Sequence, residues 1–551
     1  MSRWSPSDWF YHAEGGKHAI FRFSRKSLAV AEISSNVDDF VGHVLRIPKN
    51  DLAFAYAVLG SACTDENVAL DKETKTFLFH KIIIQPFLQC YLDLPRSVVL
   101  PVEFCAQLHH QAISSGLIPP SRLQSWRIGS SQKKINNSAI NKEGIKAALL
   151  RDHTTLIKHP RFPYKPKSTS IISVEIKPKA GYITSSPLVS PKNRCKYNHT
   201  RYSLQQRLMQ TGHIQKGWCR KEGKEDQNCK LDSVLQNSKE FTPSNYCPLH
   251  LFSENAAKIQ TALKDLSNHM QNNFRVFYNG TQIFGEDIVP SEEHSKDILG
   301  ELFLPQCKSS VNDNHETNVD VNSLLLGIII RIVSKILHRE EFLRNLRSMQ
   351  LLDVIDGDGA IRVYQRFVHL CNGSNEQAED LLDRAMLRAK DKKSTQRPKR
   401  FRQCGNNLAK SPYELPNCSS LHNLLKEIDN FRMNSDKDIN ISHNICLQLV
   451  EELSQEGCIY LLQNWLLSSA ICDVSFFITF QCLTDIQCHI MEEIQGIDHG
   501  GIIVYDGEEE GARGTRAIIH YEVKVVDCDA KPAKKLRTRE EVEGKFQFIT
   551  S

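Results

Sequence analysis

The pattern of apolar and polar positions changes most clearly along residues 170–179. The first five residues read Ser-Ile-Ile-Ser-Val, and this apolar, β-branched run predicts a strand. Polar residues then occupy alternate positions, and alternate residues of a strand share a face. We therefore expect Glu175, Lys177 and Lys179 to project together at the strand end, with Pro178 stiffening the exit. This face suits ribose or metal at the carboxylate and phosphates at the lysines, but spacing alone slightly favours a solvent-facing edge strand.

Periodicity elsewhere predicts several strands and, in the second half of the chain, amphipathic helices. Residues 77–86 are apolar without a deciding period, so they form a strand or begin a helix. Strands or extended segments are expected over residues 9–23 (as a hairpin), 40–47, 91–100, 472–478 and 520–526, with a hairpin linker over 495–516. Helices are expected over residues 49–66, 103–115, 256–270, 319–349, 363–390 and 458–469.

The first expected hairpin carries Gly15 and Gly16 at its turn. A glycine turn can lay backbone N–H groups over nucleotide phosphates, as the glycine-rich loops of kinases do. Most such glycine pairs are only turns, so the pair alone does not establish nucleotide binding.

Composition places the chain among ordinary globular proteins. It has 551 residues, enough for two or three domains, with 40% hydrophobic and 24% charged residues. A net charge of +5 argues against a dedicated nucleic-acid binder and permits a locally basic pocket. The longest apolar stretch, residues 324–333, contains Arg331 and is too short to span a membrane.

The cysteines and one basic run bear on location. The 17 cysteines are odd in number and irregular in spacing, and no apolar run follows Met1, so we expect reduced thiols in the cytosol or nucleus. No Cys-x-x-Cys pair occurs, and no zinc site is expected. Residues 392–402 are basic, which is typical of a solvated linker, of a nuclear-import signal or of an RNA-associated nuclear protein.

The Glu-Ile-Lys-Pro-Lys run at 175–179 resembles the signature motif of inositol-pentakisphosphate 2-kinases. Three more patches resemble that family in the same order: Tyr-Cys-Pro-Leu at 246–249, Gln-Asn-Asn-Phe-Arg-Val-Phe at 271–277 and Val-Val-Asp-Cys-Asp-Ala-Lys-Pro at 525–532. One short motif is weak evidence, but four ordered patches are specific. Plant members of the family carry a zinc site after a segment similar to 351–367, where this chain offers only His369 and Cys371.

The resemblance implies an α+β, two-lobed inositol-phosphate kinase fold with an antiparallel sheet in each lobe and helical insertions in the second lobe. The expected limits are an N-lobe over 1–150, a hinge over 151–154 and a C-lobe over 155–551, with irregular inserts near 216–242 and 390–419. The implied reaction is phosphoryl transfer from ATP, with Mg²⁺, to the 2-hydroxyl of inositol 1,3,4,5,6-pentakisphosphate. We expect a monomer in the nucleus and cytoplasm, with no membrane or nucleic-acid partner.

Residue roles follow from the same resemblance. Asp473 is implied as the base, Lys177 as a second catalytic group and Asp527 as the Mg²⁺ ligand. Nucleotide contacts are implied for Gly15, Gly16, Lys17, His18, Val44, Arg46, Arg151, Asp152, His153, Glu175, Arg275 and Asp527. Substrate contacts are implied for Arg122, Lys177, Lys179, Arg201, Asn272, Asn273, Lys531, Lys535 and Arg539.

The basic residues match the charge of the implied substrate. Five phosphate groups carry roughly −8 to −10 in total, at about −1.5 to −2 each. The chain departs from the family pattern at Arg151, Met209, His250 and Cys472. The alternative function is therefore a catalytically weak or inactive inositol-phosphate-binding scaffold of the same fold.

Overall fold

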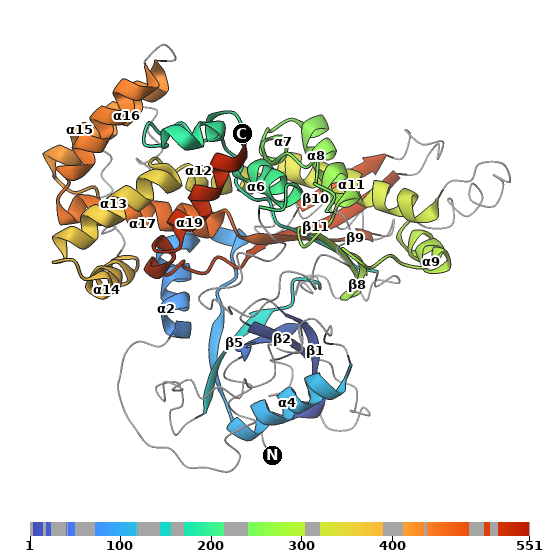
Figure 1. The fold of residues 1–551 in the computed structure, drawn as a ribbon. Helices are drawn as coiled ribbons and strands as arrows, with labels where there is room; N and C mark the ends of the chain where they lie inside the picture. Colours follow the sequence, from blue (N-terminus) through green and yellow to red (C-terminus); the bar gives the residue numbers. More distant parts are fainter. Residues whose placement is uncertain are drawn as a thin grey trace. The chain divides into compact units, whose positions relative to one another are not determined.

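The computed structural model describes residues 4–14, 18–23, 40, 42–49, 72–116, 118, 144–155, 170–213, 241–303, 320–388, 411–434, 438–483, 501–506 and 516–549. The chain forms two compact units, Met1–Lys81 with Asp93–His159, and Ile82–Leu92 with Pro160–Ser551. Helices combine with two sheets in which neighbouring strands run antiparallel, which confirms the expected α+β class (Figure 1). The limits given for lobes and hinge stay a prediction.

The first unit is built on a five-stranded sheet with the order β1-β2-β3-β5-β4. The expected hairpin at its start is confirmed, because β1 pairs with β2 antiparallel. The strand bounds are β1 Trp9–Glu14, β2 His18–Phe23, β3 His43–Pro48, β4 Arg96–Leu100 and β5 Ile145–Arg151.

Helix α4 (Val102–Ser114) covers one face of this sheet and confirms the helix expected over 103–115. Trp9, Phe21, Phe40, Leu45 and Phe104 are buried in the core that lies between sheet and helix. A short 3-10 helix, η1 (Pro6–Asp8), precedes β1.

The apolar run over 77–86 is helical. Helix α2 (Lys72–Phe79) is followed by a π-helical turn (His80–Ile84), α3 (Gln85–Leu88) and η4 (Gln89–Tyr91). Pro86 stands in the first turn of α3, directly after the π-helical turn.

The second unit is built on a six-stranded sheet with the order β10-β11-β9-β6-β7-β8. Its bounds are β6 Ile172–Ile176, β7 Phe274–Tyr278, β8 Thr281–Phe284, β9 Ser475–Leu483, β10 Gly501–Asp506 and β11 Arg516–Val526. β6 lies between β9 and β7, and all five of its residues are buried. The alternative of a solvent-facing edge strand is therefore wrong.

The second unit also contains many helices. Among them, α6, α8, α11, α14 and α17 begin after an N-cap side chain that accepts a hydrogen bond from a backbone N–H of the first turn; in order, these N-caps are Thr200, Asn255, Asp320, Ser374 and Ser454. The helix α17 lies at the centre of one group and packs against α12, α13 and α14 (Figure 1). The bounds are η6 Pro191–Tyr197, α6 Arg201–Gln210, α7 Pro248–Leu251, α8 Ala256–Asn268, α9 Glu292–Phe303, α11 Val321–Arg339, α12 Phe342–Gln350, α13 Asp356–Leu370, α14 Asn375–Ala385, α15 Ser419–Met433, α16 Ile439–Glu451, α17 Gln455–Ile471, η12 Ala533–Leu536, α19 Arg539–Gly544 and η13 Lys545–Ile549.

The apolar stretch at 324–333 lies inside α11, which is longer than the stretch itself. With 19 residues and a mean hydropathy of 1.6, α11 is long and apolar enough to cross a membrane by length and composition alone. It packs against α8 and α9, and Leu325, Ile329 and Val333 are among its buried residues. A core helix passes the same test, so this feature is weak evidence for a membrane span.

Candidate active site

The strand register of the second sheet brings four distant chain segments to one edge. β6 ends at Ile176, which pairs with Phe274 at the start of β7 and with Phe476 near the start of β9. β11 ends at Val526, which pairs with Ser475, the first residue of β9. The residues just outside these strand ends therefore lie along the same edge, and they include Lys177, Asn272, Asp473 and Asp527.

Asp473 lies among lysines at this edge. Lys531 Nζ donates a hydrogen bond of 2.7 Å to Asp473 Oδ2, although the carboxylate side chain is 61% exposed. Desolvation by the surrounding protein raises the pKa of Asp473, but the charges of Lys531, Lys179 and Lys177 outweigh it and leave this pKa below its usual value. Asp473 is therefore ionised at neutral pH and faces three of the predicted phosphate-binding or catalytic lysines.

The two motif lysines reach this place without the predicted strand alternation. β6 ends at Ile176, and Lys179 has a φ of 60°, in the left-handed region. The backbone is fixed there by hydrogen bonds, because Pro178 O accepts from Tyr246 Oη at 2.8 Å and Lys179 O accepts from Gln350 Nε2 at 2.9 Å. The alternation therefore holds no further than the strand itself.

Glu175 and Arg275, both predicted to contact nucleotide, form a cross-strand pair. They are register partners on β6 and β7, and Arg275 Nη1 lies 3.0 Å from Glu175 Oε2. Only 8% of the Glu175 surface is exposed, so Arg275 supplies the countercharge that a buried carboxylate needs.

The two predicted asparagines have different surroundings. Asn273 is 2% exposed, and its Nδ2 donates to Tyr202 Oη and Gln271 Oε1, both at 3.4 Å. Its backbone oxygen accepts from Lys177 N at 2.9 Å. Asn273 therefore supports the Lys177 backbone from inside the protein, whereas Asn272 is only partly buried.

Asp527 follows the last strand with a φ of 61°, and it is exposed. Asp529 stands two residues further and is partly exposed. Carboxylate oxygens are the ligands that Mg²⁺ prefers, so the donor chemistry at this strand end fits the implied ion. Lys535 lies in η12, where its N–H donates to Pro532 O at 3.0 Å.

Of the predicted nucleotide residues that the structure describes in the first unit, Val44, Arg46 and Asp152 are buried and the other three are partly exposed. Val44 and Arg46 are 7% and 6% exposed on β3, and His18 opens β2. Gly15, Gly16, Lys17 and Arg122 lie outside the described residues, as do most of the two predicted inserts and the basic run at 392–402.

The predicted hinge begins at Arg151, the last residue of β5. Asp152 turns inward, where its Oδ1 accepts from Thr154 N at 2.9 Å and its Oδ2 lies 2.7 Å from Arg22 Nε. Arg151 and His153 both approach Asp93 Oδ2, at 3.6 and 3.9 Å. The Asp152 backbone is also bonded within the protein, because its N–H donates to Gly42 O at 2.8 Å and its O accepts from Thr155 N at 3.2 Å.

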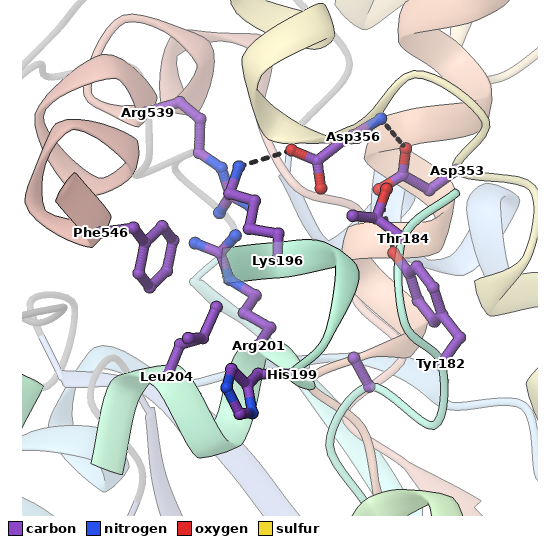
Figure 2. A pocket seen from close by; sticks show the side chains of 11 residues that line it. Tyr182, Thr184, Lys196, His199, Arg201, Leu204, Asp353, Asp356, Arg539 and Phe546 are labelled. Carbon is purple, nitrogen blue, oxygen red and sulfur yellow. Dashed lines mark hydrogen bonds and ion pairs between the residues drawn. The ribbon is translucent and has the colours of Figure 1, made fainter. Parts of the chain in front are cut away.

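A pocket in the second unit brings together two predicted substrate residues and several that the sequence did not suggest (Figure 2). Arg201 and Arg539 were predicted. The other lining residues are Ala180, Tyr182, Thr184, Lys196, His199, Leu204, Asp353, Asp356 and Phe546.

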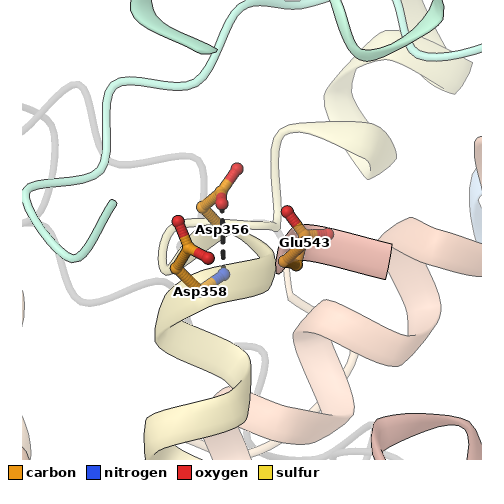
Figure 3. Close-up of side chains that lie close together, drawn as sticks. All are labelled: Asp356, Asp358 and Glu543. Carbon is orange, nitrogen blue, oxygen red and sulfur yellow. Dashed lines mark hydrogen bonds between the residues drawn. The ribbon is translucent and has the colours of Figure 1, made fainter. Parts of the chain in front are cut away.

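Beside this pocket lies a group of three cations and three carboxylates, which we call the Glu543 cluster: Lys196, Arg201, Arg539, Asp356, Asp358 and Glu543. Arg201 Nη1 and Arg539 Nε each lie 2.7 Å from the same oxygen, Glu543 Oε1. The carboxylate oxygens approach within 4.8 Å of one another, as metal ligands do (Figure 3). Lys196 Nζ lies 2.5 Å from Asp356 Oδ1, 3.2 Å from Asp358 Oδ2 and in contact with Glu543. Its ammonium group therefore supplies positive charge to the three carboxylates, as a bound metal ion would.

No local signal in the sequence pointed to this cluster. Lys196 and Asp356 are 160 residues apart, and Arg201 and Glu543 are 342 apart. Carboxylates at such separations carry no periodicity or motif that would connect them before the fold is known.

Comparison with known proteins completes the assignment. A family described as "Inositol-pentakisphosphate 2-kinase" matches residues 11–545, nearly the whole chain. The "Inositol-pentakisphosphate 2-kinase" of Arabidopsis thaliana is 25% identical over 381 residues, 66% of this chain and 70% of the relative. The "Inositol-pentakisphosphate 2-kinase IPK1" of Oryza sativa subsp. indica is 28% identical over 242 residues, 43% of each chain.

A relative from Danio rerio, also named "Inositol-pentakisphosphate 2-kinase", is 22% identical over 339 residues, 61% of this chain and 56% of the relative. The match thus spans less than half of the rice relative and somewhat more than half of the zebrafish one. The family match over residues 11–545 is the decisive finding. The chain belongs to the inositol-pentakisphosphate 2-kinase family.

Proposed function

We propose that this protein transfers the γ-phosphoryl group of ATP to the 2-hydroxyl of inositol 1,3,4,5,6-pentakisphosphate, giving inositol hexakisphosphate. The observation that carries the proposal is the sheet edge, where Asp473 lies against Lys531 at 2.7 Å and its pKa is held down by Lys531, Lys179 and Lys177. A carboxylate among lysines suits the phosphorylation of the one free hydroxyl on a ring that already carries several phosphates. The lysines bind phosphates, and the carboxylate accepts the hydroxyl proton.

Asp473 acts in this proposal as the base and as the group that orients the attacking oxygen. Its low pKa makes it a weak base, which suits phosphoryl transfer. The transition state is largely dissociative, so the hydroxyl proton needs to leave only late. The carboxylate oxygen accepts the O–H hydrogen bond in the ground state. It takes the proton as the new O–P bond forms and as the bond from the γ-phosphorus to the β,γ-bridging oxygen breaks, which releases ADP.

Lys177, Lys179 and Lys531 supply the countercharge. Lys177 is held by its backbone bond to Asn273, and Lys179 by the bond from Gln350, so both ammonium groups extend from fixed backbone positions. A fixed backbone limits the freedom that these side chains lose when phosphates bind, and positioning of this kind is the main contribution that a protein makes to phosphoryl transfer.

Asp527, with Asp529 beside it, would hold Mg²⁺, which neutralises charge on the transferring phosphoryl group when bound. The Glu175–Arg275 pair is proposed for the nucleotide side. Arg275 orients Glu175, so that the carboxylate can accept hydrogen bonds from ribose hydroxyls.

The direct test is incubation of the purified full-length chain with inositol pentakisphosphate and Mg-ATP, with mass detection of hexakisphosphate. Formation of that product supports the proposal, and its absence under conditions where the protein is folded would reject it.

The second candidate is a binding scaffold of the same fold that has lost turnover. It is favoured by the ion pair itself, because Lys531 occupies an oxygen of the proposed base. Calorimetry separates the two functions, since tight pentakisphosphate binding without turnover identifies the scaffold.

A further inference from the structure

The charges of the Glu543 cluster are balanced, unlike those of the sheet edge. The cluster holds three basic and three acidic residues, whereas Asp473 lies among three lysines. Yet the cluster includes Arg201 and Arg539, two residues implied in substrate binding, and both line the pocket. A site that only needed positive charge would not place a buried carboxylate against these two guanidinium groups.

Glu543 is built into the protein and is not a surface group that happens to lie nearby. It is 1% exposed, and its two oxygens meet Arg201 and Arg539 on one side and Lys196 on the other. Burial raises the pKa of Glu543, but Arg201, Lys196 and Arg539 lower it far more, so it is ionised. A Cβ at Gly357 would lie 2.4 Å from Glu543 Oε1, so the first turn of α13 leaves the space that the carboxylate fills.

The two guanidinium groups are also fixed by aromatic rings. Arg539 lies over the Trp465 ring at 5.0 Å, and Arg201 lies over the Phe546 ring at 5.3 Å. A guanidinium has five N–H donors in one plane, so one ring contact and one carboxylate contact set its plane and its rotation. Each arginine keeps donors that the contact with Glu543 does not use, and both side chains line the pocket (Figure 2).

Without the carboxylate the two arginines would separate. Arg201 lowers the pKa of Arg539, second only to burial, because the two cations lie close together. Glu543 Oε1 bridges them at 2.7 Å on each side and offsets this repulsion.

We propose that Glu543 is a specificity-determining positioning residue, which holds Arg201 and Arg539 at the spacing and orientation that match phosphates fixed on an inositol ring. This inference rests on the proposed function. In this role Glu543, although it is acidic and buried, makes the site prefer phosphates held on a rigid ring over a flexible polyanion.

The test compares two ligands by calorimetry on the full chain: inositol 1,3,4,5,6-pentakisphosphate and inorganic tripolyphosphate. Glu543→Gln keeps the size of the side chain and removes its charge. We expect pentakisphosphate affinity to fall about ten- to a hundredfold, the usual effect of losing charge-assisted geometry. Tripolyphosphate affinity should stay the same or rise, because the pocket gains net positive charge.

The matched control is Glu541→Gln on the same helix, since Glu541 is 67% exposed and only approaches Lys545 at 3.9 Å. It should change neither affinity. The KM for pentakisphosphate should rise in Glu543→Gln while the KM for ATP stays near wild type, which a general loss of structure would not produce.

A second variant, Glu543→Asp, keeps the charge and withdraws the carboxylate by one methylene, so it should also lose pentakisphosphate affinity without gaining tripolyphosphate affinity. If neither Glu543 variant keeps the wild-type unfolding midpoint, Arg539→Lys is measured instead. It keeps the charge and loses the planar fork of donors, so it should also lose pentakisphosphate affinity without gaining tripolyphosphate affinity. Equal changes for both ligands, or no change for pentakisphosphate, would overturn the proposal. A wild-type chain that binds no pentakisphosphate would reject the proposed function itself and this inference with it.

Discussion

Lys531 donates a 2.7 Å hydrogen bond to Asp473, so a residue predicted to bind substrate and the predicted base are partners before any ligand arrives. The two lie 58 positions apart, one before β9 and the other after β11. Because the pair forms at the sheet edge, the charge state of the base depends on a group that would also meet substrate phosphates.

Asp473→Asn should abolish most turnover. Asparagine keeps the shape and an oxygen that Lys531 can contact, but it cannot take a proton. Turnover should fall about 10²- to 10⁴-fold, the usual contribution of a general base. Pentakisphosphate affinity measured by calorimetry should change little, because only a transition-state role is lost. Turnover near wild type would place the base elsewhere.

Lys179→Ala should weaken substrate binding more than nucleotide binding. Loss of one charge-assisted contact, worth about 1.5–3 kcal/mol, corresponds to roughly ten- to a hundredfold in the Kd for pentakisphosphate. The effect should shrink as salt rises, since screening already reduces the attraction. Lys258→Ala, at an exposed position of α8, is the control. If ATP affinity falls as much as pentakisphosphate affinity, Lys179 belongs to the nucleotide side.

Gly357→Ala should destabilise the second unit. The new Cβ would lie 2.4 Å from Glu543 Oε1 and 3.0 Å from Arg539 Nε, both held in the buried cluster. Overpacking of this kind costs about 1–3 kcal/mol, measurable by denaturant unfolding. Gly327→Ala in α11 is the matched control, because its Cβ meets nothing within 4 Å and alanine is the better helix former. It should leave stability unchanged or raise it by about 1 kcal/mol, and equal losses in both variants would contradict the steric argument.

These residues also show how far the sequence alone could lead. The motif at 175–179 and the strand patterns placed Lys177, Asp473 and Asp527 at strand ends, and antiparallel register brought those ends together. The alternation failed at Lys179, because a left-handed residue fixed by Tyr246 and Gln350 depends on contacts that no local period encodes. Glu543 was missed for a related reason, since Lys196, Arg201 and Asp356 become its neighbours only in the fold.

The buried carboxyl of Asp353 should make stability depend on pH. Burial, with Asp356 nearby, raises the pKa of Asp353 to about 6, while Tyr182 Oη donates to its Oδ2 at 2.9 Å. A raised carboxyl pKa stabilises the folded protein below the unfolded pKa, and this contribution is lost as pH rises to about 6. Asp353→Asn does not titrate. Wild type should therefore lose thermal stability relative to the variant between about pH 4 and pH 6, and parallel melting curves across that range would contradict the assignment.

Lys531→Met should move the acid limb of the pH–rate profile. Asp473 must be ionised to act as base, so kcat/KM falls when it protonates, and this limb reports the pKa in the free enzyme. In wild type Lys531 is the strongest of the three lysines that lower this pKa, against a burial effect that raises it. Removing the ammonium group takes away the largest lowering effect, so the pKa of Asp473 should rise and the acid limb should shift to higher pH. Substrate phosphates also titrate near neutrality, but they do so equally in both proteins, so the difference between the two profiles isolates Asp473. Lys534→Met removes one charge from η12, three residues further along the chain, and Lys534 is not among the main groups that lower the pKa of Asp473, so this variant should shift the limb much less. An acid limb that stays in place in Lys531→Met would show that Asp473 is not the group whose ionisation activates the hydroxyl.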